Sequence, residues 1–311
     1  MRPRLTVLGS LNMDISVVVR RLPVPGETVL GSGAVVAPGG KGANQAVAAA
    51  RLGAAVRMVG CLGADEFGQM ARAALGGEGV DVSGVRVVEK SATGLALITV
   101  DAAGENMITV APGANGQAGA DEVAAALSAA CDVLVLSAEI PAGVVAAVLD
   151  GARAAGMTCL LNLAPASLEA ATLLAGGVSW LVVNESEAAA VLGRHVAGLA
   201  GAAAAARDLR ALGAQHAVVT AGADGAALAG PAGDEAVNAI TVRSVDSVGA
   251  GDAFVAALAV TAAAGVPVRD AVRAACAAGA AATTRRGTQE ALPRPPDIAA
   301  ATGASWPVVT E

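Results

Sequence analysis

From Ala120 to Leu228 the chain alternates between segments with helical spacing of apolar residues and short, continuously apolar segments. The first kind predicts helices and the second predicts buried strands. This alternation favours a doubly wound α/β fold with a largely parallel sheet and helices on both faces. The predicted helices are Asp121–Ala129, Ala142–Ala155, Glu185–Leu192 and Ala202–Leu212, and the predicted strands are Val133–Ser137, Thr158–Leu163, Trp180–Val183, Ala217–Thr220 and Ala226–Leu228. Leu5–Gly9 and Val56–Gly60 read as earlier strands, with a helix at Glu66–Leu75.

The composition sets limits on the kind of protein. Of 311 residues 55% are hydrophobic but only 1% aromatic, so Ala, Val and Leu must build the core of one domain spanning residues 1–311. No apolar run is long enough for a membrane span, and the N-terminus reads as a first strand rather than a signal peptide. The net charge of −7 argues against nucleic-acid or membrane partners. Four scattered cysteines without CxxC spacing indicate free thiols and a cytoplasmic location.

Two β-rich insertions interrupt the alternation. Ile15–Arg20 and Thr28–Val36 read as strands joined through Pro23–Glu27, and a second group of strands follows at Val85–Val88, Gly94–Val100 and Met107–Val110. We expect these pieces to form one small sheet, contributed by about residues 14–36 and 92–110. Such a sheet could cover a substrate as a lid and exclude water.

The stretch Asp246–Phe254 (DSVGAGDAF) precedes a long run of small apolar residues at helical spacing. Gly249 and Gly251 allow a tight turn into that helix, whose first amides can bind phosphate oxygens. Asp252 stands at the same edge, where a carboxylate would repel a phosphate but could take a proton from an attacking hydroxyl. The alternative is a glycine turn with Asp252 as an ordinary capping residue.

A second glycine-rich stretch, Pro38–Gln45, leads into the helical run Ala46–Leu52. It is not a Walker A loop, because Val35 and Gly42 stand where that pattern needs Gly and Ser or Thr. Lys41 and Asn44 would supply donors to a ligand with many hydroxyls, such as a sugar. The alternative is a glycine-rich connection with a solvated lysine.

Polar residues follow several predicted strands, at the edge where α/β proteins usually bind ligands. They are Asp14, Glu139, Asn162, Asn184, Glu187 and Thr220. Each could also be a turn or cap residue. Asn184 and Glu187 in particular fit a capping box, or could hold Mg²⁺ through water.

Some chemistries are excluded by what the sequence contains. The only histidines are His195 and His216, so a His-rich metal site is excluded, and neither lies near a nucleophile elbow. A Rossmann dehydrogenase would need GxGxxG after the first strand, and Gly9–Asp14 does not supply it.

Taken together, these motifs resemble the ribokinase family of PfkB-type carbohydrate kinases over nearly the whole chain. The most specific stretches are Gly39–Ala46 (GGKGANQA) and Asp246–Asp252, which occur in the family's order and separation. Supporting matches are Gly9–Asp14, Pro25–Thr28, Asn162–Ala166, Asn184–Glu187 and Thr220–Gly225. The resemblance implies transfer of the γ-phosphoryl group of ATP to the 5-hydroxyl of D-ribose.

The resemblance also implies roles for individual residues. Asp252 would be the general base, with Gly249, Ala250 and Gly251 as the anion hole. The sugar would be bound by Asn12, Met13, Asp14, Gly40, Lys41, Gly42, Asn44 and Glu139. ATP would lie against Asn184, Thr220, Ala221, Gly222, Ala223, Asp224, Gly225, Gly251 and Cys276, and Mg²⁺ near Asn184 and Glu187.

The resemblance further implies a monovalent cation, K⁺, near the anion hole, and a homodimer formed by pairing of the small lid sheets. The cation would lie near Asp246, Val248, Ala282, Arg285, Gly287 and Ala291. Ala291 stands where the resemblance implies a hydroxyl-bearing ligand, so water could replace that ligand or the K⁺ dependence could be reduced.

Three other readings stay open on the sequence alone. The same chemistry could act on another sugar, such as fructose or deoxyribose. A nucleoside such as adenosine is disfavoured because the only aromatic residues are Phe67, Trp180, Phe254 and Trp306. A sugar-binding protein without catalysis is a third reading, which the presence of Asp252, Asn184 and Glu187 argues against.

Overall fold

The computed structural model describes residues 1–166 and 170–308. The strands are β1 (Arg4–Leu8), β2 (Asn12–Val18), β3 (Val35–Gly39), β4 (Ala55–Gly63), β5 (Asp81–Val88), β6 (Gly94–Val100), β7 (Asn106–Ala111), β8 (Val133–Ser137), β9 (Cys159–Asn162), β10 (Val178–Asn184), β11 (Ala214–Thr220), β12 (Gly225–Gly230) and β13 (Gly233–Asn238). The helices are α1 (Lys41–Arg51), α2 (Glu66–Gly77), α3 (Ala120–Leu127), α4 (Ala142–Ala154), α5 (Ala171–Leu174), α6 (Glu185–Leu192), α7 (Gly198–Ala211), α8 (Ala250–Ala263), α9 (Val268–Ala282) and α10 (Pro295–Thr302). Short 3₁₀ turns lie at Gly113–Gln117, Gly222–Asp224 and Gln289–Ala291.

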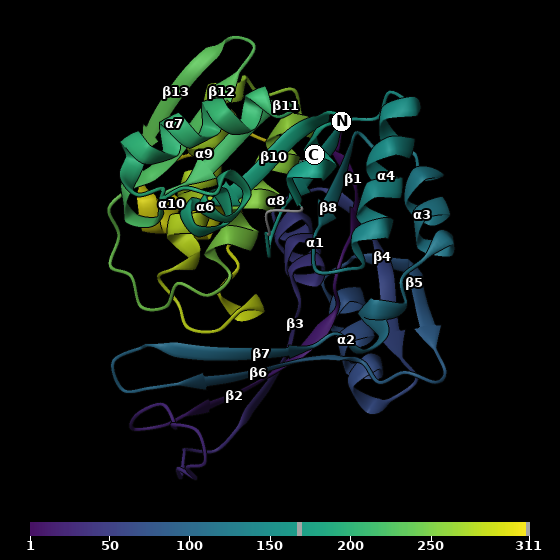
Figure 1. The fold of residues 1–311 in the computed structure, drawn as a ribbon, viewed down its shortest axis with the longest axis vertical. Helices are drawn as coiled ribbons and strands as arrows, with labels where there is room; N and C mark the ends of the chain where they lie inside the picture. The colour runs from purple at the N-terminus through teal and green to yellow at the C-terminus, as the bar shows by residue number, and fades with distance from the viewer. Residues whose placement is uncertain (167–169, 309–311) are drawn as a thin grey trace.

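A nine-stranded sheet forms the centre of the molecule, in the order β13-β12-β11-β10-β9-β8-β1-β4-β5 (Figure 1). All pairings from β11 to β5 are parallel, and only β12 and β13 add in antiparallel fashion. The predicted doubly wound, largely parallel sheet is therefore confirmed. Strand β13 was not predicted, because its stretch Gly233–Asn238 carries two acidic residues and is not an apolar run.

The two faces of this sheet are covered by different helices, because side chains alternate along each strand. Val133 and Val135 of β8 point into a core shared with α1, α8 and α9, whereas Leu134 and Leu136 point into a core shared with α4 and α7. Small residues dominate both cores, as the composition requires. No helix within the described residues has the length and hydrophobicity to cross a membrane.

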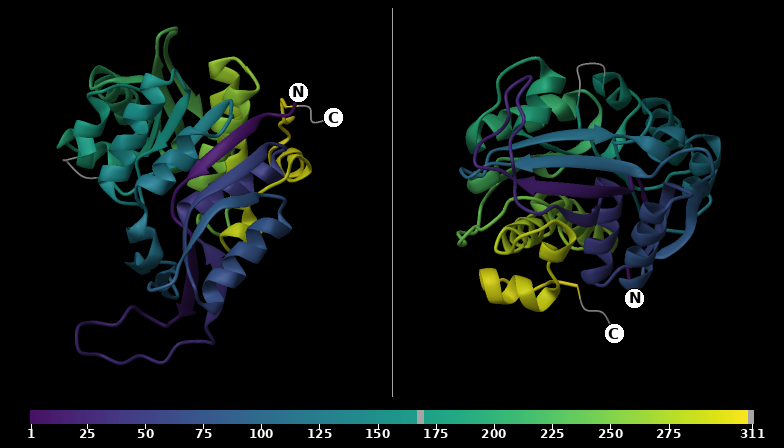
Figure 2. Two further views of the ribbon diagram at one scale, coloured as in Figure 1. Left: turned by 90° about the vertical axis from the view of Figure 1, so that its right-hand side faces the viewer. Right: turned by 90° about the horizontal axis from the view of Figure 1, so that it is seen from below.

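A separate four-stranded sheet, in the order β3-β2-β6-β7, projects from one end of the molecule (Figure 1). Figure 2 shows the connection between β2 and β3 extending as a long loop beyond the strands. Two predictions about this region are wrong. Val85–Val88 belongs to β5, which pairs with β4 at the edge of the large sheet, since α2 completes a β-α-β unit there. Residues 28–34 form no strand, and β3 begins only at Val35.

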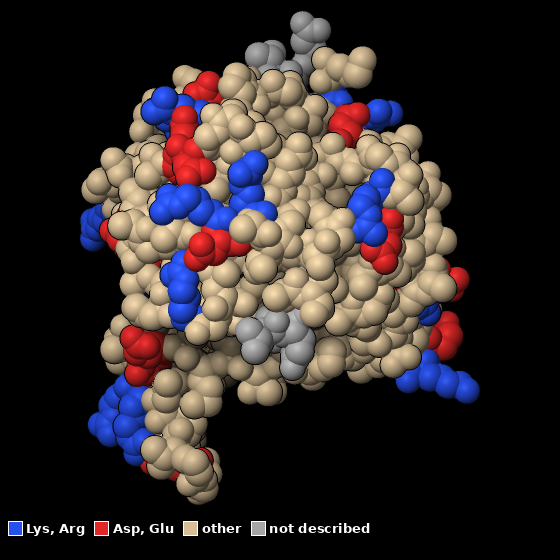
Figure 3. Space-filling view, turned by 45° about the horizontal axis from the view of Figure 1, so that its top comes forward, with Lys and Arg blue, Asp and Glu red and all other residues tan. Residues whose placement is uncertain are grey.

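Charged side chains do not form one extended basic surface on the face drawn in Figure 3. There the Lys and Arg side chains stand in small groups beside Asp and Glu. This pattern agrees with the net charge of −7.

Candidate active site

Polar side chains from several elements converge at the carboxyl edge of the large sheet. They surround a cavity of about 240 Å³ whose polar lining comprises Lys41, Asn162, Asn184, Glu187, Thr220, Ser247 and Asp252. Asn162, Asn184 and Thr220 end three neighbouring parallel strands, β9, β10 and β11. Parallel strands bring their carboxyl ends to one edge, so the predicted clustering of these residues is what the fold produces.

Helix α8 starts at this cavity and places Asp252 in its first turn. Gly249 is the N-cap with a φ of 78°, a left-handed conformation that favours glycine. The amide of Ala250 donates to the carbonyl of Ser247 at 3.3 Å, so the amides of the next residues are the ones free to face a ligand. Gly251 has open space where a side chain would stand. An anion can therefore approach the start of the helix closely.

The Asp252 side chain is 8% exposed and is held by two amides of α1. Asn44 Nδ2 donates to Oδ2 at 3.0 Å, and Gln45 Nε2 donates to Oδ1 at 3.0 Å. Burial raises the pKa of Asp252, while Lys41 and the two amide donors act in the opposite direction. A buried carboxylate that is hydrogen-bonded yet raised in pKa has the properties of a general base.

Lys41 is the first residue of α1 and lies among carboxylates. Its Nζ is 4.0 Å from Glu139 Oε1, and its backbone amide donates to Glu139 Oε2 at 3.3 Å. Ser10 Oγ donates to the same Oε2 at 2.6 Å. Burial lowers the pKa of Lys41, but Asp252, Glu139 and Glu187 outweigh it, so the net shift is upward and the ammonium stays charged.

Asn12, Met13 and Asp14 lie on β2 rather than in a loop after β1. Asp14 points over Gly39, where an added Cβ would come within 2.3 Å of the carboxylate, so a side chain at position 39 would displace the Asp14 carboxylate. Burial, followed by the charges of Glu139 and Asp252, raises the pKa of Asp14 to about 6. Met13 points to the opposite face and is fully buried in the core, which leaves only its main chain for a ligand.

Two glycines at the start of α1, the N-cap Gly40 and Gly42 in the first turn, are needed for close packing. Gly40 has a φ of 90°, and a Cβ there would lie 2.8 Å from both Ser10 O and Asn12 N. A Cβ on Gly42 would lie 2.6 Å from the carbonyl carbon of Gly9. The helix begins at Lys41, five residues before the predicted Ala46, so these glycines belong to its start and not to a preceding loop.

Asn184 and Glu187 form the predicted capping box of α6. Asn184 Oδ1 accepts the amide of Glu187, and Glu187 Oε2 accepts the amide of Asn184, both at 2.8 Å. The second carboxylate oxygen remains for a ligand in the cavity. Burial raises the pKa of Glu187, and the hydrogen bond from Asn184 opposes this shift.

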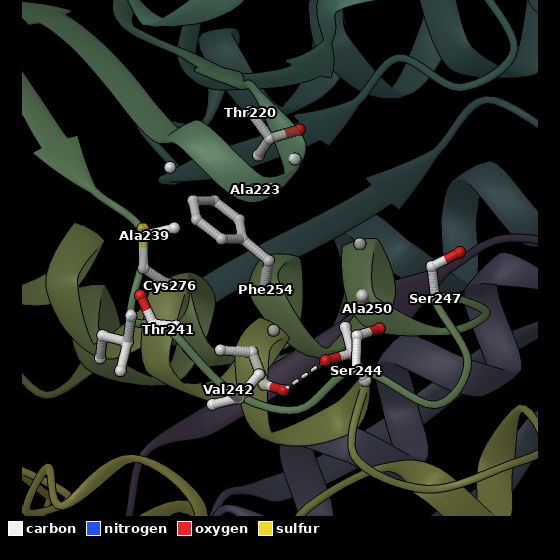
Figure 4. A pocket seen from close by; sticks show the side chains of 17 residues that line it. Thr220, Ala223, Ala239, Thr241, Val242, Ser244, Ser247, Ala250, Phe254 and Cys276 are labelled. Atoms are coloured by element: carbon white, nitrogen blue, oxygen red, sulfur yellow. Dashed lines mark hydrogen bonds between the residues drawn. The ribbon is translucent and has the colours of Figure 1, made fainter.

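A larger, mostly apolar pocket of about 560 Å³ adjoins the polar cavity. It is lined by Thr220, Gly222, Ala223, Gly225, Ala239, Ile240, Thr241, Val242, Ser244, Ser247, Ala250, Gly251, Phe254, Cys276, Gly279, Ala280 and Thr283. Figure 4 shows the ring of Phe254 pointing from α8 toward Thr220 and Ala223, with Cys276 on the wall beside Ala239. Burial raises the pKa of the Cys276 thiol to about 12, so it acts as a small apolar group.

The loop before α8 is tied to the end of α9 by Asp246. Its Oδ1 accepts the amide of Val248 at 3.1 Å, and its Oδ2 accepts the amide of Gly287 at 3.2 Å. The Arg285 side chain pairs with Asp297, so only the backbone carbonyl of Arg285 could bind a cation. Ala291 is 1% exposed and offers no side-chain oxygen. Across residues 1–166 and 170–308, no three His, Cys, Asp or Glu side chains converge on a metal site.

Sequence reasoning missed the amides that hold the predicted residues in place. Gln45 Nε2 donates to Asp252 Oδ1 at 3.0 Å, Gln289 Nε2 donates to Asn44 Oδ1 at 3.1 Å, and Asn115 Nδ2 donates to Asn12 Oδ1 at 2.7 Å. Ser10, within the quoted stretch Gly9–Asp14, was also given no role. Nothing in a single sequence separates such residues from ordinary polar positions of a helix or turn.

A wide apolar pocket that opens onto a small polar cavity with a buried carboxylate at a helix start is suited to a phosphotransferase acting on a small hydroxyl compound. The sequence profile described as "pfkB family carbohydrate kinase" matches residues 2–295. The chain belongs to this family of carbohydrate kinases.

Relatives and solved structures agree with this assignment. A ribokinase of Haemophilus influenzae is 35% identical over 94% of this chain and 96% of its own length. A ribokinase of Schizosaccharomyces pombe is 36% identical over 93% and 94%. The structure of Arabidopsis thaliana ribokinase complexed with ribose and ATP aligns with a TM-score of 0.85 at 30% identity, covering 96% of this chain and 98% of that chain.

Proposed function

We propose that this protein transfers the γ-phosphoryl group of ATP to the 5-hydroxyl of D-ribose. The observation that carries the proposal is the place of Asp252, buried at the start of α8 where the apolar and polar cavities meet. The ribokinase relatives, and the Arabidopsis structure that contains ribose and ATP, support the choice of substrates.

In the proposed reaction Asp252 takes the proton of the sugar's 5-hydroxyl while the oxygen of that hydroxyl forms a bond to the γ-phosphorus. The bond between that phosphorus and the β–γ bridging oxygen breaks, and ADP leaves. The free amides that follow Ala250, that of Gly251 first, would stabilise charge on the transferred group, in the turn that Gly249 and Ala250 form. Lys41 stays protonated beside them and adds a positive charge.

The sugar would lie between β2 and α1, within reach of Asp252. Asp14 and Glu139 would accept hydrogen bonds from its hydroxyls, and Lys41, Asn12 and Asn44 would donate or accept others. Backbone groups of Gly40 and Gly42, and the main chain of Met13, complete the proposed binding set. Because a sugar offers several hydroxyls and no charge, this mixture of donors and acceptors suits it.

The nucleotide base would occupy the apolar pocket, where Cys276 and Phe254 form part of the wall. Its phosphates would pass Asn184 and the turn Thr220–Gly225 toward Gly251. Glu187 offers a free carboxylate oxygen of the kind that Mg²⁺ prefers, while Asn184 Oδ1 already accepts from the amide of Glu187 and from Ser186 Oγ, so the ion would reach this pair through its water shell. When bound, Mg²⁺ neutralises charge on the phosphates.

A monovalent cation would be held by the loop that Asp246 organises. Asp246 and the carbonyls of Val248, Ala282, Arg285 and Gly287 supply oxygens of the kind that K⁺ prefers, and the buried methyl of Ala291 leaves one ligand to water. We propose that the ion fixes the loop leading into α8, and that its effect on activity is smaller than in a site with a full set of protein ligands.

The small sheet of β2, β3, β6 and β7 is proposed to act as the lid, contributed by residues 14–36 and 92–110, and to pair two subunits. Asp14 faces the site, whereas the neighbours Ile15, Val36 and Leu97 share the opposite face. Val36 is 42% exposed and Leu97 49% exposed, so pairing of two lids through this face would remove apolar surface from water. Leu97→Glu should shift the protein from dimer to monomer in sedimentation. A wild-type protein that sediments as a monomer at all concentrations would contradict the pairing.

The test of the function is an ADP-release assay with Mg·ATP and ribose, deoxyribose, fructose or adenosine, each with and without K⁺. The expected result is a preference for ribose and a modest K⁺ effect. Preference for another acceptor would keep the family chemistry and move the substrate. The four free cysteines support assay under reducing conditions and a cytoplasmic location, which we also propose.

A further inference from the structure

The carboxylate of Asp252 is part of a chain of side-chain amides that runs through the protein interior. Gln45 Nε2 donates to Asp252 Oδ1 at 3.0 Å and to Asn162 Oδ1 at 2.9 Å. Asn162 Nδ2 in turn donates to the carbonyl of Val182 at 3.2 Å. The chain therefore fixes Gln45 to the ends of β9 and β10, which belong to the rigid central sheet.

This geometry allows only one orientation of the Gln45 amide. Both hydrogens of Nε2 are used, one by Asp252 and one by Asn162. If the amide were turned over, its oxygen would face two acceptor oxygens and two hydrogen bonds would become repulsive contacts. Asn162 is itself oriented by the Val182 carbonyl, which accepts hydrogen bonds and cannot donate them. The direction of the donor to Asp252 is thus set by the backbone of β10.

The second oxygen of the carboxylate is held differently. Asn44 Nδ2 donates to Oδ2, and Asn44 Oδ1 accepts from Gln289. Asn44 belongs to the proposed sugar set, so a substrate that binds it competes for its hydrogen bonds. Gln45 is completely buried and lines neither cavity. Its hydrogen bond to Oδ1 is the one that can persist when the sugar enters.

We propose that Gln45, oriented by Asn162, is a positioning residue that holds the carboxylate of Asp252 in the rotamer needed to take the proton of the acceptor hydroxyl. This inference rests on the proposed function of Asp252 as the base. It also gives a role to Asn162, which lies in the stretch Asn162–Ala166 that resembles the family but has no part in the proposed chemistry. Gln45 touches neither sugar nor nucleotide and acts only through Asp252.

The surroundings of Asp252 define what else could move its ionisation. Lys41 at the start of α1 favours the charged form, while Glu139 after β8 disfavours it. Glu187 of α6 and Asp14 of β2 are also coupled to Asp252 by their charges. A substitution at Gln45 leaves all of these in place, because the described hydrogen bonds of its side chain are to Asp252 and Asn162 alone.

The test compares Gln45→Met, which keeps the length of the side chain but has no donor, with the wild-type enzyme. Losing a hydrogen bond to a charged group should lower kcat about 10- to 100-fold near neutral pH. The KM for ribose should change much less. Since the ionised carboxylate loses a donor, the acid limb of the kcat profile should move to higher pH.

A second measurement does not depend on turnover. Protein labelled with ¹³C at the aspartate carboxyls is titrated without substrates, and the Asp252 signal is identified by its loss in Asp252→Asn. The pKa of Asp252 should be higher in Gln45→Met than in the wild type. If the wild-type protein phosphorylates no sugar, the proposed function fails, and this titration still tests the contact.

Ser137→Ala is the matched control. Ser137 pairs with Asn162 in the sheet register and is fully buried, and its Oγ has no partner among the described residues. Ser137→Ala removes a buried polar group at the same sheet edge and should leave the acid limb of the kcat profile unchanged. The inference is overturned if Gln45→Met keeps the wild-type kcat, or loses activity equally at all pH values with an unshifted acid limb and Asp252 titration.

Discussion

The two cavities at the carboxyl edge of the sheet differ in size and chemistry. The larger, about 560 Å³, is walled by alanines, glycines, Val242, Ile240, Phe254 and Cys276, with hydroxyls as its polar side chains. The smaller, about 240 Å³, brings Lys41, Glu187 and Asp252 together. Thr220, Ser247 and Gly251 line both. The larger cavity can bind a ligand through its apolar shape, whereas the smaller one carries the charged groups that a reaction needs. The two cavities meet at the start of α8.

The difference follows from which elements build each space. The polar cavity lies over β9, β10 and β11, where parallel strands end and their last side chains turn polar. The apolar pocket lies between β12, α8 and α9 and the segment after β13, where helices pack through small residues. Gly251 keeps the passage open, because it leaves empty the space a side chain would fill. Each cavity should therefore respond separately to substitution.

Asp252→Asn should show the largest effect and act only on the polar cavity. Asparagine keeps the shape but cannot take a proton, so turnover should fall by about 10²–10⁴-fold, the range for a positioned general base. Initial-rate assays with varied ribose and ATP would measure it.

The control for this variant is binding, since ribose and ATP should still bind Asp252→Asn in calorimetry. Turnover within a few-fold of wild type would remove Asp252 from its role. A variant that binds neither substrate would show that the two cavities are not separable in the way their linings indicate.

Cys276→Phe should act on the apolar pocket alone. A ring in place of the thiol occupies space needed by the base, and a steric cost of about 1–3 kcal/mol corresponds to about a 5- to 150-fold rise in the KM for ATP. The KM for ribose should stay unchanged.

Cys276→Ala is the matched control, because it removes the sulfur without filling the pocket and should change the KM for ATP little. If Cys276→Ala raised that KM as much as Cys276→Phe, the thiol would have a specific contact rather than form part of an apolar wall. An equal rise for ribose would contradict the separation of the two cavities.

The sequence predicted the reactive residues of the site better than the residues that hold them in place. Asp252 and Lys41 were found because glycines at fixed spacing mark places where a backbone must approach a ligand. Gln45 and Gln289 were missed because an amide in a helix or turn has no distinctive local pattern. Their partners are 207 and 245 residues away in sequence. Only the fold brings such pairs together.

The errors in the fold have similar causes. The strand expected at Thr28–Val36 is β3, displaced to Val35–Gly39, and it includes Pro38 and Gly39, which strand patterns normally exclude. Its place at the edge of the small sheet makes the proline tolerable, since an edge strand can lose a donor. Val85–Val88 was assigned to the wrong sheet because only a short connection separates it from β6, and pairing is not a local property.

Asp14→Asn should show the smallest effect, and with opposite signs in two assays. The pKa of Asp14 rises from its ordinary 3.8 to about 6, with burial the main cause, so the charged form costs stability. The stabilising contribution of the protonated form is complete below about pH 3.8 and is lost as pH rises through about 6. At pH 7–8 the free energy of unfolding of Asp14→Asn should exceed that of the wild type by on the order of 1 kcal/mol.

Urea unfolding between pH 5 and 8 would measure this gain, which should shrink toward pH 5, while calorimetry at pH 7.5 should show weaker ribose binding. Asp132→Asn is the matched control, because the hydrogen bond from Arg4 lowers the pKa of Asp132 and its removal should not stabilise the fold. A lower stability of Asp14→Asn at pH 7.5 would mean that the carboxylate is satisfied in the unliganded protein. Asp14 would then stabilise the fold, and the cost of burying its charge, which points to a sugar-binding role, would be absent.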